Sequence, residues 1–82
     1  MRFLDAIRDH GVETLQVYLS ETEARRLRSA LDALLKAPED WTHEHVFAED
    51  GSREMSLSIV TPRKLGDLAR YSEIERRVLT ED

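Results

Sequence analysis

Two histidines separated by one residue are the most chemically suggestive feature of the sequence. His43 and His45 flank Glu44 in a stretch that has the composition of a strand. On a strand, side chains two positions apart point to the same side, so both imidazoles could share one metal ion with a carboxylate as third ligand. No further histidine lies nearby, and a zinc site needs more than two ligands. We expect no metal and no other cofactor, and we keep a metal-binding regulator that uses His43 and His45 as the alternative function.

The acidic residues are concentrated in one window. The 82 residues carry a formal net charge of −5, and the stretch from Glu39 to Glu54, with six acids and one base, accounts for all of it. We expect four of these acids to bind a partner, and they are Glu44, Glu49, Asp50 and Glu54. A surface of this sign repels nucleic acid and attracts a basic protein. Acids at the rim of a hairpin can also serve only solubility and the protection of an edge strand, and both interpretations stay open.

The sequence contains no set of residues that marks catalysis. Cysteine is absent, the three glycines are scattered, and no Gly-x-Ser-x-Gly turn occurs. A serine nucleophile needs such a turn or a comparable oxyanion site, and a phosphate-binding loop needs clustered glycines. Arg25, Arg26 and Arg28 fan around a predicted helix without base-stacking aromatics, which is typical of a solvated helix face. We therefore expect a protein without catalytic residues that is not an enzyme and does not bind nucleic acid.

A long helix is the clearest element, and the pattern predicts it at about residues 21–36. Ser20 and Glu23 have the spacing of a capping box at its start. Ala37-Pro38 ends it, because the residue before a proline is pushed out of the helical region. Apolar residues recur at three- and four-residue steps along the helix, and they are Ala24, Leu27, Leu31 and Leu34. We expect this stripe to pack on apolar strand residues, which are Leu15, Val17, Leu57 and Ile59.

Two strands are expected before the helix. Val12–Leu19 alternates with period two and is rich in strand formers, which predicts a strand. Residues 2–9 are ambiguous, because they have helical propensity as well. We favour a first strand there, since a lone strand needs a neighbour and His10-Gly11 suits a two-residue hairpin turn.

A second hairpin is expected after the helix, with Gly51 in the left-handed position of a three-residue loop. That register gathers the apolar side chains on one face, together with His43 and His45. A two-residue loop would instead set Glu44 beside Leu57 and mix the two faces. We favour the first register because it separates apolar from polar side chains.

The order of elements predicts an α+β fold within a single domain of residues 1–82. In ββαββα order, one small antiparallel sheet would carry the long helix on its apolar face, with a C-terminal helical tail at 61–82. Thr61-Pro62 and the capping box Ser72–Glu75 would start helical turns in that tail. No apolar run approaches the roughly 20 residues of a membrane span, and Met1–Asp5 reaches a charge too soon for a signal peptide. We therefore expect a cytoplasmic protein without a membrane partner.

One segment resembles a known class of proteins. It consists of Trp41-Thr42-His43-Glu44-His45-Val46-Phe47 followed by Gly51-Ser52-Arg53-Glu54-Met55-Ser56-Leu57-Ser58-Ile59. Over residues 12–60 the chain resembles some small bacterial immunity proteins of polymorphic-toxin systems, which share a His-x-His-Val strand, a Gly-Ser turn and an alternating strand. It also resembles small uncharacterised bacterial proteins. The resemblance implies a non-catalytic cytoplasmic binder that blocks a toxin, and acidic inhibitors of cationic toxins fit this role because charge steers association.

Overall fold

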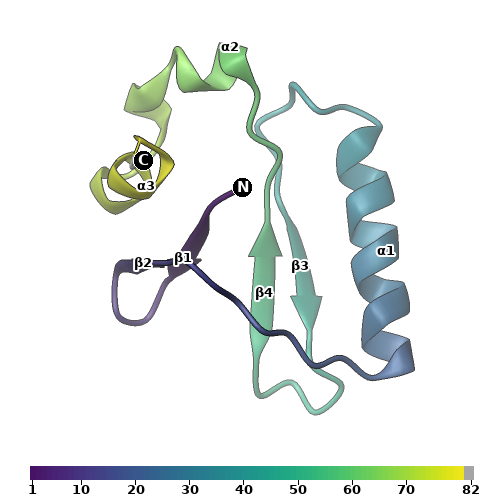
Figure 1. Cartoon of the computed structure of the whole chain (residues 1–82). Helices are drawn as coiled ribbons and strands as arrows, with labels where there is room; N and C mark the ends of the chain where they lie inside the picture. The colour runs from purple at the N-terminus through teal and green to yellow at the C-terminus, as the bar shows by residue number, and fades with distance from the viewer. Residues whose placement is uncertain (81–82) are drawn as a thin grey trace. The chain divides into compact units, whose positions relative to one another are not determined.

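The computed structural model describes residues 1–80 and shows short strands mixed with helices (Figure 1). In chain order the elements are β1 (Phe3–Asp5), β2 (His10–Val12), α1 (Glu21–Leu35), β3 (Glu44–Phe47), β4 (Glu54–Leu57), α2 (Pro62–Leu65), the 3-10 helix η1 (Leu68–Arg70) and α3 (Glu73–Thr80). The α+β class is confirmed, and so is the order of two strands, a long helix, two strands and C-terminal helices. The strands form two separate antiparallel pairs, β1–β2 and β3–β4, instead of the one small sheet that the sequence predicted. None of the helices in this part of the chain has the length and apolar character of a membrane span.

The described residues group into two compact units. One unit contains Met1–Val17 and the C-terminal stretch that begins at Asp67, and the other contains Tyr18–Gly66. Each unit has its own hairpin and at least one helix that contacts it. That all residues form a single domain stays a prediction.

The first hairpin turns before His10-Gly11 rather than at it. The Asp5 carboxylate accepts hydrogen bonds from the backbone N–H groups of Ile7 and Arg8, at 3.0 and 3.1 Å. An aspartate that bonds the backbone two and three residues on starts a turn. Asp9 completes the turn with a left-handed backbone at φ 55°. A strand is therefore confirmed near the N-terminus, but His10-Gly11 lies within β2.

The strand predicted over Val12–Leu19 is wrong except for Val12. Within residues 1–80, the backbone of residues 14–19 makes no hydrogen bond. A strand needs a neighbour that pairs with its backbone. The partner of Val12 is Phe3, near the start of the chain, so β1 extends too little to pair with the residues that follow. Leu15 and Val17, which were expected in the core, are consequently 47% and 46% exposed.

The start of α1 agrees with the prediction. The Ser20 hydroxyl accepts from the Glu23 backbone N–H at 3.1 Å, and a Glu23 carboxylate oxygen accepts from the Ser20 backbone N–H at 2.8 Å. The helix begins at Glu21 and ends at Leu35, with Lys36 as its C-cap. A capping box uses only residues within one turn, which is why sequence spacing was sufficient to find it.

The buried face of α1 differs from the predicted stripe. Ala30 and Leu34 are buried, and Leu27 is half-buried. Ala24 is exposed and Leu31 is 40% exposed, so these two residues lie outside the core. The stripe is rotated around the helix axis relative to the prediction.

A tertiary hydrogen bond favours this rotation of α1. The second carboxylate oxygen of Glu23 accepts from the backbone N–H of Glu49, in the turn between β3 and β4, at 2.9 Å. Glu23 therefore faces the hairpin, and the residues that follow it at helical steps of four, three and four share its side. These residues are Leu27, Ala30 and Leu34.

The register of β3 and β4 is also shifted by one residue from the favoured prediction. Glu44 lies opposite Leu57, and Val46 lies opposite Met55. This pairing was not favoured from the sequence, because it mixes apolar and polar side chains on the same face. Gly51 does adopt the predicted left-handed backbone, at φ 73°. The Asp50 carboxylate accepts from both the backbone and the hydroxyl of Ser52, which keeps Ser52 in the loop instead of opposite Ala48. The Ala48 N–H bonds the Arg53 carbonyl instead, at 2.9 Å.

The C-terminal helices start where the sequence predicts. Thr61 caps α2, with Pro62 as its first residue, and Ser72 and Glu75 form a capping box at the start of α3. In the unit that contains β1 and β2, α3 contacts both strands, and its Val78 is 6% exposed. The second hairpin and α1 form the other unit, where the candidate site lies.

Candidate functional site

The two faces of the β3–β4 hairpin differ in burial. On the side of α1, Val46 is 6% exposed, whereas on the opposite side Phe47 is 50% exposed. Side chains alternate between the faces along a strand, so His43 and His45 lie on the same side as Phe47, and Glu54 lies opposite Phe47 on β4. We call this surface, formed by His43, His45, Phe47 and Glu54, the ring face. The ring face is exposed to solvent, whereas the other face of the same hairpin packs on α1.

The rings of the ring face form a row. The centroids of His43 and His45 lie 4.8 Å apart with the ring planes nearly perpendicular. The His45 and Phe47 rings stack with centroids 6.0 Å apart and an angle of 22° between their planes. A Glu54 carboxylate oxygen lies 3.2 Å from His45 Nδ1. Aromatic rings prefer edge-to-face and stacked arrangements, so the contacts between neighbouring rings stabilise the row.

The placement of both histidines among core residues was wrong. The one-residue shift of register turns His43 and His45 away from α1 and turns Glu44 towards it, because side chains alternate along a strand. The reason lies in the turn, where the Asp50–Ser52 hydrogen bonds set the loop length. Glu44 is half-buried on the α1 side.

The structure brings together three of the four acids predicted to bind a partner. Glu49 and Asp50 lie in the turn between the strands, and Glu54 begins β4 a few residues later. Glu44 is separated from them because its side chain lies on the opposite face of β3. The candidate site therefore consists of the ring face and the two acids of the turn, without Glu44.

Hydrogen bonds stabilise the charged form of Asp50. Its carboxylate accepts from the Ser52 hydroxyl at 2.6 Å and from the Ser52 backbone N–H at 2.9 Å. The hydroxyl bond is the larger cause, and the two bonds together lower the pKa of Asp50 below its ordinary value. The turn therefore keeps a negative charge well into acidic solution.

Two arginines partly offset the acids around the turn. Arg26 of α1 donates from Nη1 to the backbone carbonyl of Phe47 at 3.2 Å. Arg53 donates from Nη1 to the Ser52 hydroxyl, also at 3.2 Å. Neither bond ends on a carboxylate, so these two arginines do not occupy the acceptor atoms of the acids. The surface is less negative than the sequence window suggests, but its acids are available to an outside donor.

Another acid of the window, Glu39, is held in an ion pair away from the ring face. Its carboxylate accepts from Arg63 Nε and from the Thr61 hydroxyl, both at 2.8 Å, and its carbonyl accepts from Arg63 Nη2 at 2.7 Å. The Arg63 bond is the main cause that lowers the pKa of Glu39. This set of bonds fastens α2 to the loop before β3 and contributes nothing to a binding surface.

Sequence reasoning missed a buried lysine next to this ion pair. Lys64 is 2% exposed, and its Nζ donates to the Ile59 carbonyl at 2.8 Å and lies 5.6 Å from the centre of the Trp41 ring. A carbonyl and an aromatic face are partners that stabilise a buried ammonium group. Lysine is normally exposed, and its position in the sequence carries no signal of burial. We assign it a structural role.

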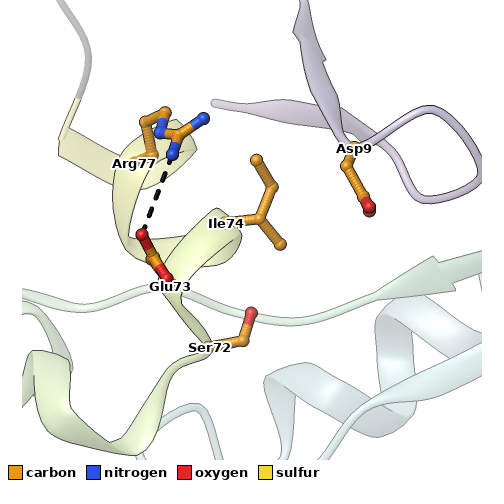
Figure 2. Close-up of a pocket in the computed structure, with 5 residues that line it drawn as sticks. All are labelled: Asp9, Ser72, Glu73, Ile74 and Arg77. Atoms are coloured by element: carbon orange, nitrogen blue, oxygen red, sulfur yellow. Dashed lines mark ion pairs between the residues drawn. The ribbon is translucent and has the colours of Figure 1, made fainter.

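A shallow hollow of about 410 Å³ lies in the unit that contains β1, β2 and α3. Figure 2 shows its five lining residues, with Glu73 and Arg77 joined as an ion pair at 3.9 Å. The hydroxyl of Ser72 in its wall already caps α3. The lining residues Ser72, Glu73 and Arg77 are therefore engaged within or at the start of α3.

The chemistry that the ring face can perform is recognition. It offers stacked rings, a carboxylate and two adjacent acids on a solvated strand pair. Within residues 1–80, no group of three or more His, Cys, Asp and Glu side chains is placed to hold a metal ion, and His43 and His45 therefore stay a pair. Comparison of the chain with protein families, with curated proteins and with solved structures finds no match.

Proposed function

We propose that this protein is a small, non-catalytic cytoplasmic binding module whose β3–β4 hairpin receives a basic protein. In the form that the resemblance to immunity proteins suggests, the partner is a cationic toxin that the module inhibits. The observation that supports the proposal is the grouping of Glu49, Asp50 and Glu54 at one end of a hairpin whose ring face is exposed. We place the interface there and leave out Glu44.

Exposed acids of this kind act mainly on the rate of encounter. Glu54 is 53% exposed at its side chain, and hydrogen bonds from Ser52 lower the pKa of Asp50 further below neutral pH. Solvated charges steer an oppositely charged partner and speed association, whereas they add little to the lifetime of the complex. The rings beside them supply apolar and aromatic contact area, which is what holds interfaces together after encounter.

The test is a pull-down from the native host followed by association kinetics on the captured protein. The neutralised hairpin variant carries Glu49→Gln, Asp50→Asn and Glu54→Gln, which remove three charges but keep hydrogen-bond acceptors. The matched control changes three exposed acids elsewhere, with Glu13→Gln, Asp32→Asn and Asp67→Asn. Both variants have the same net charge, so a slower association of the hairpin variant alone supports the proposal. An acidic partner, or equal rates for the two variants, contradicts it.

A metal-binding regulator is the second candidate. The observation that favours it is the 4.8 Å between the ring centroids of His43 and His45, with the Glu54 carboxylate 3.2 Å from His45. Imidazole is a ligand that zinc accepts, but within residues 1–80 no third side chain is placed to complete the site, so this candidate needs further ligands from a partner or solvent. Zinc titration separates this candidate from the binding module.

A further inference from the structure

We infer that the ring face recognises an arginine side chain of the basic partner, which stacks on Phe47 and pairs with Glu54. This inference rests on the proposed function and names the chemical group that the partner presents. Its basis is that one exposed ring and one exposed carboxylate are neighbours on the same face of two paired strands.

The two groups are placed for a single ligand. Phe47 and Glu54 are direct partners across β3 and β4, and side chains of direct partners lie next to each other. Phe47 is 50% exposed, and the Glu54 side chain is 53% exposed. His45 lies 3.2 Å from one carboxylate oxygen of Glu54, which leaves the other oxygen for an outside donor.

A guanidinium group matches this arrangement better than an ammonium group does. It is planar, so its face can lie on the Phe47 ring while the N–H groups at its edge bond the Glu54 carboxylate. An ammonium is a compact and strongly hydrated charge without a flat face. His45 stacks on one side of the Phe47 ring, so the guanidinium would lie on the other side.

Among the residues that the structure describes, no lysine or arginine lies on the Phe47 ring. Arg26 reaches Phe47, but it donates to the backbone carbonyl rather than lying on the ring. Arg53 bonds the hydroxyl of Ser52. Lys64 lies over the ring of Trp41 rather than that of Phe47. The Phe47 ring and the Glu54 carboxylate are both exposed to solvent, and an incoming arginine would displace water from them.

The experiment compares two peptides of equal charge on the full-length protein. In one peptide arginine alternates with serine, and in the other lysine replaces arginine. Binding is measured by fluorescence anisotropy at pH 8 and at low salt, where charge attraction is weakly screened. We expect the arginine peptide to bind at least about threefold more tightly, the size of one exposed cation–π contact. Phe47→Ala should abolish this preference, whereas the control Leu35→Ala, at a residue of α1 that is 62% exposed, should keep it.

A second variant tests whether Phe47→Ala acts only by disturbing the fold. Phe47→Leu keeps an apolar side chain in β3 but removes the ring, so it should also lose the arginine preference. If it keeps the preference, or if the wild-type protein binds both peptides equally, the arginine inference is overturned. Equal binding that weakens in the neutralised hairpin variant leaves the proposed function standing. If neither peptide binds at low salt, the inference and the proposed function both fail.

Discussion

Glu23 of α1 bonds the backbone N–H of Glu49 at the turn of the second hairpin, at a distance of 2.9 Å. Its other carboxylate oxygen accepts from the backbone N–H of Ser20 at 2.8 Å, so one side chain caps the helix and fastens it to the hairpin. The turn that carries Glu49 and Asp50 is therefore held by the start of α1. This contact connects the stability of the helix with the position of the candidate binding surface.

The two bonds to Glu23 predict a dependence of stability on pH. The bond from Ser20 is the larger cause and that from Glu49 the next, and together they lower the pKa of Glu23. A carboxyl whose pKa is lower in the folded state stabilises the fold above its unfolded pKa, and this contribution is lost as the pH falls through the folded pKa. In thermal melts, we expect the Glu23→Gln variant to lose less stability than the wild-type protein when the pH is lowered from 5 to 3. The control Glu13→Gln should follow wild type, and a Glu23→Gln curve parallel to wild type would contradict the role of these bonds.

The rotated face of α1 predicts which leucine supports the core. Leu34 is 4% exposed and Leu31 is 40% exposed. Leu34→Ala should reduce the free energy of unfolding by about 2–5 kcal/mol, because it removes buried atoms and leaves a cavity. Leu31→Ala should cost less than about 1 kcal/mol, since much of its side chain is already solvated. Urea melts of the two variants decide the matter, and a larger loss in Leu31→Ala would restore the stripe expected from the sequence.

The extended segment before α1 predicts fast amide exchange. Within the part of the chain that the structure describes, the backbone of residues 14–19 has no hydrogen-bond acceptor or donor in the protein. Amides without such bonds exchange without any unfolding step. In native-state hydrogen exchange we expect Leu15 and Val17 to exchange at nearly the rate of a free peptide, and Leu34 to be protected. Strong protection at Val17 would show that this segment is paired as a strand after all.

Sequence reasoning succeeded where structure depends on neighbours in the chain. The capping boxes at Ser20 and Ser72 and the left-handed Gly51 are set by residues within one turn, and the spacing of the residues predicted all three. Failures came from contacts between distant residues. The rotation of α1 depends on the bond between Glu23 and Glu49, which spans 26 positions and leaves no periodic pattern.

The composition of the candidate site was predicted in part, since Phe47 was missed, and its geometry was not predicted. His43, His45 and Glu54 were all singled out, yet the favoured register put the histidines on the wrong face. That register was chosen for its separation of apolar and polar side chains, whereas the loop length follows from the carboxylate of Asp50. Side chains alternate between the two faces of a strand, so the one-residue shift of register determines which side chains contact α1 and which are exposed to solvent.

Zinc binding distinguishes the two proposed functions without knowledge of a partner. Two imidazoles alone rarely hold the ion, so calorimetry of the tag-free protein should show no site tighter than about tens of micromolar. A stoichiometric complex with sub-micromolar affinity, lost in His43→Ala, would favour the metal-binding regulator. His10→Ala is the matched control, because His10 lies in β2, outside the ring face.

The most direct test of the central claim is the association rate of the captured basic partner as a function of salt. The account predicts that the neutralised hairpin variant associates at least about tenfold more slowly than wild type at low salt, and that the difference shrinks as salt screens the charges. The control variant with Glu13→Gln, Asp32→Asn and Asp67→Asn should stay close to wild type. If the hairpin variant and the control slow association equally, or if neither depends on salt, the hairpin does not receive a basic partner.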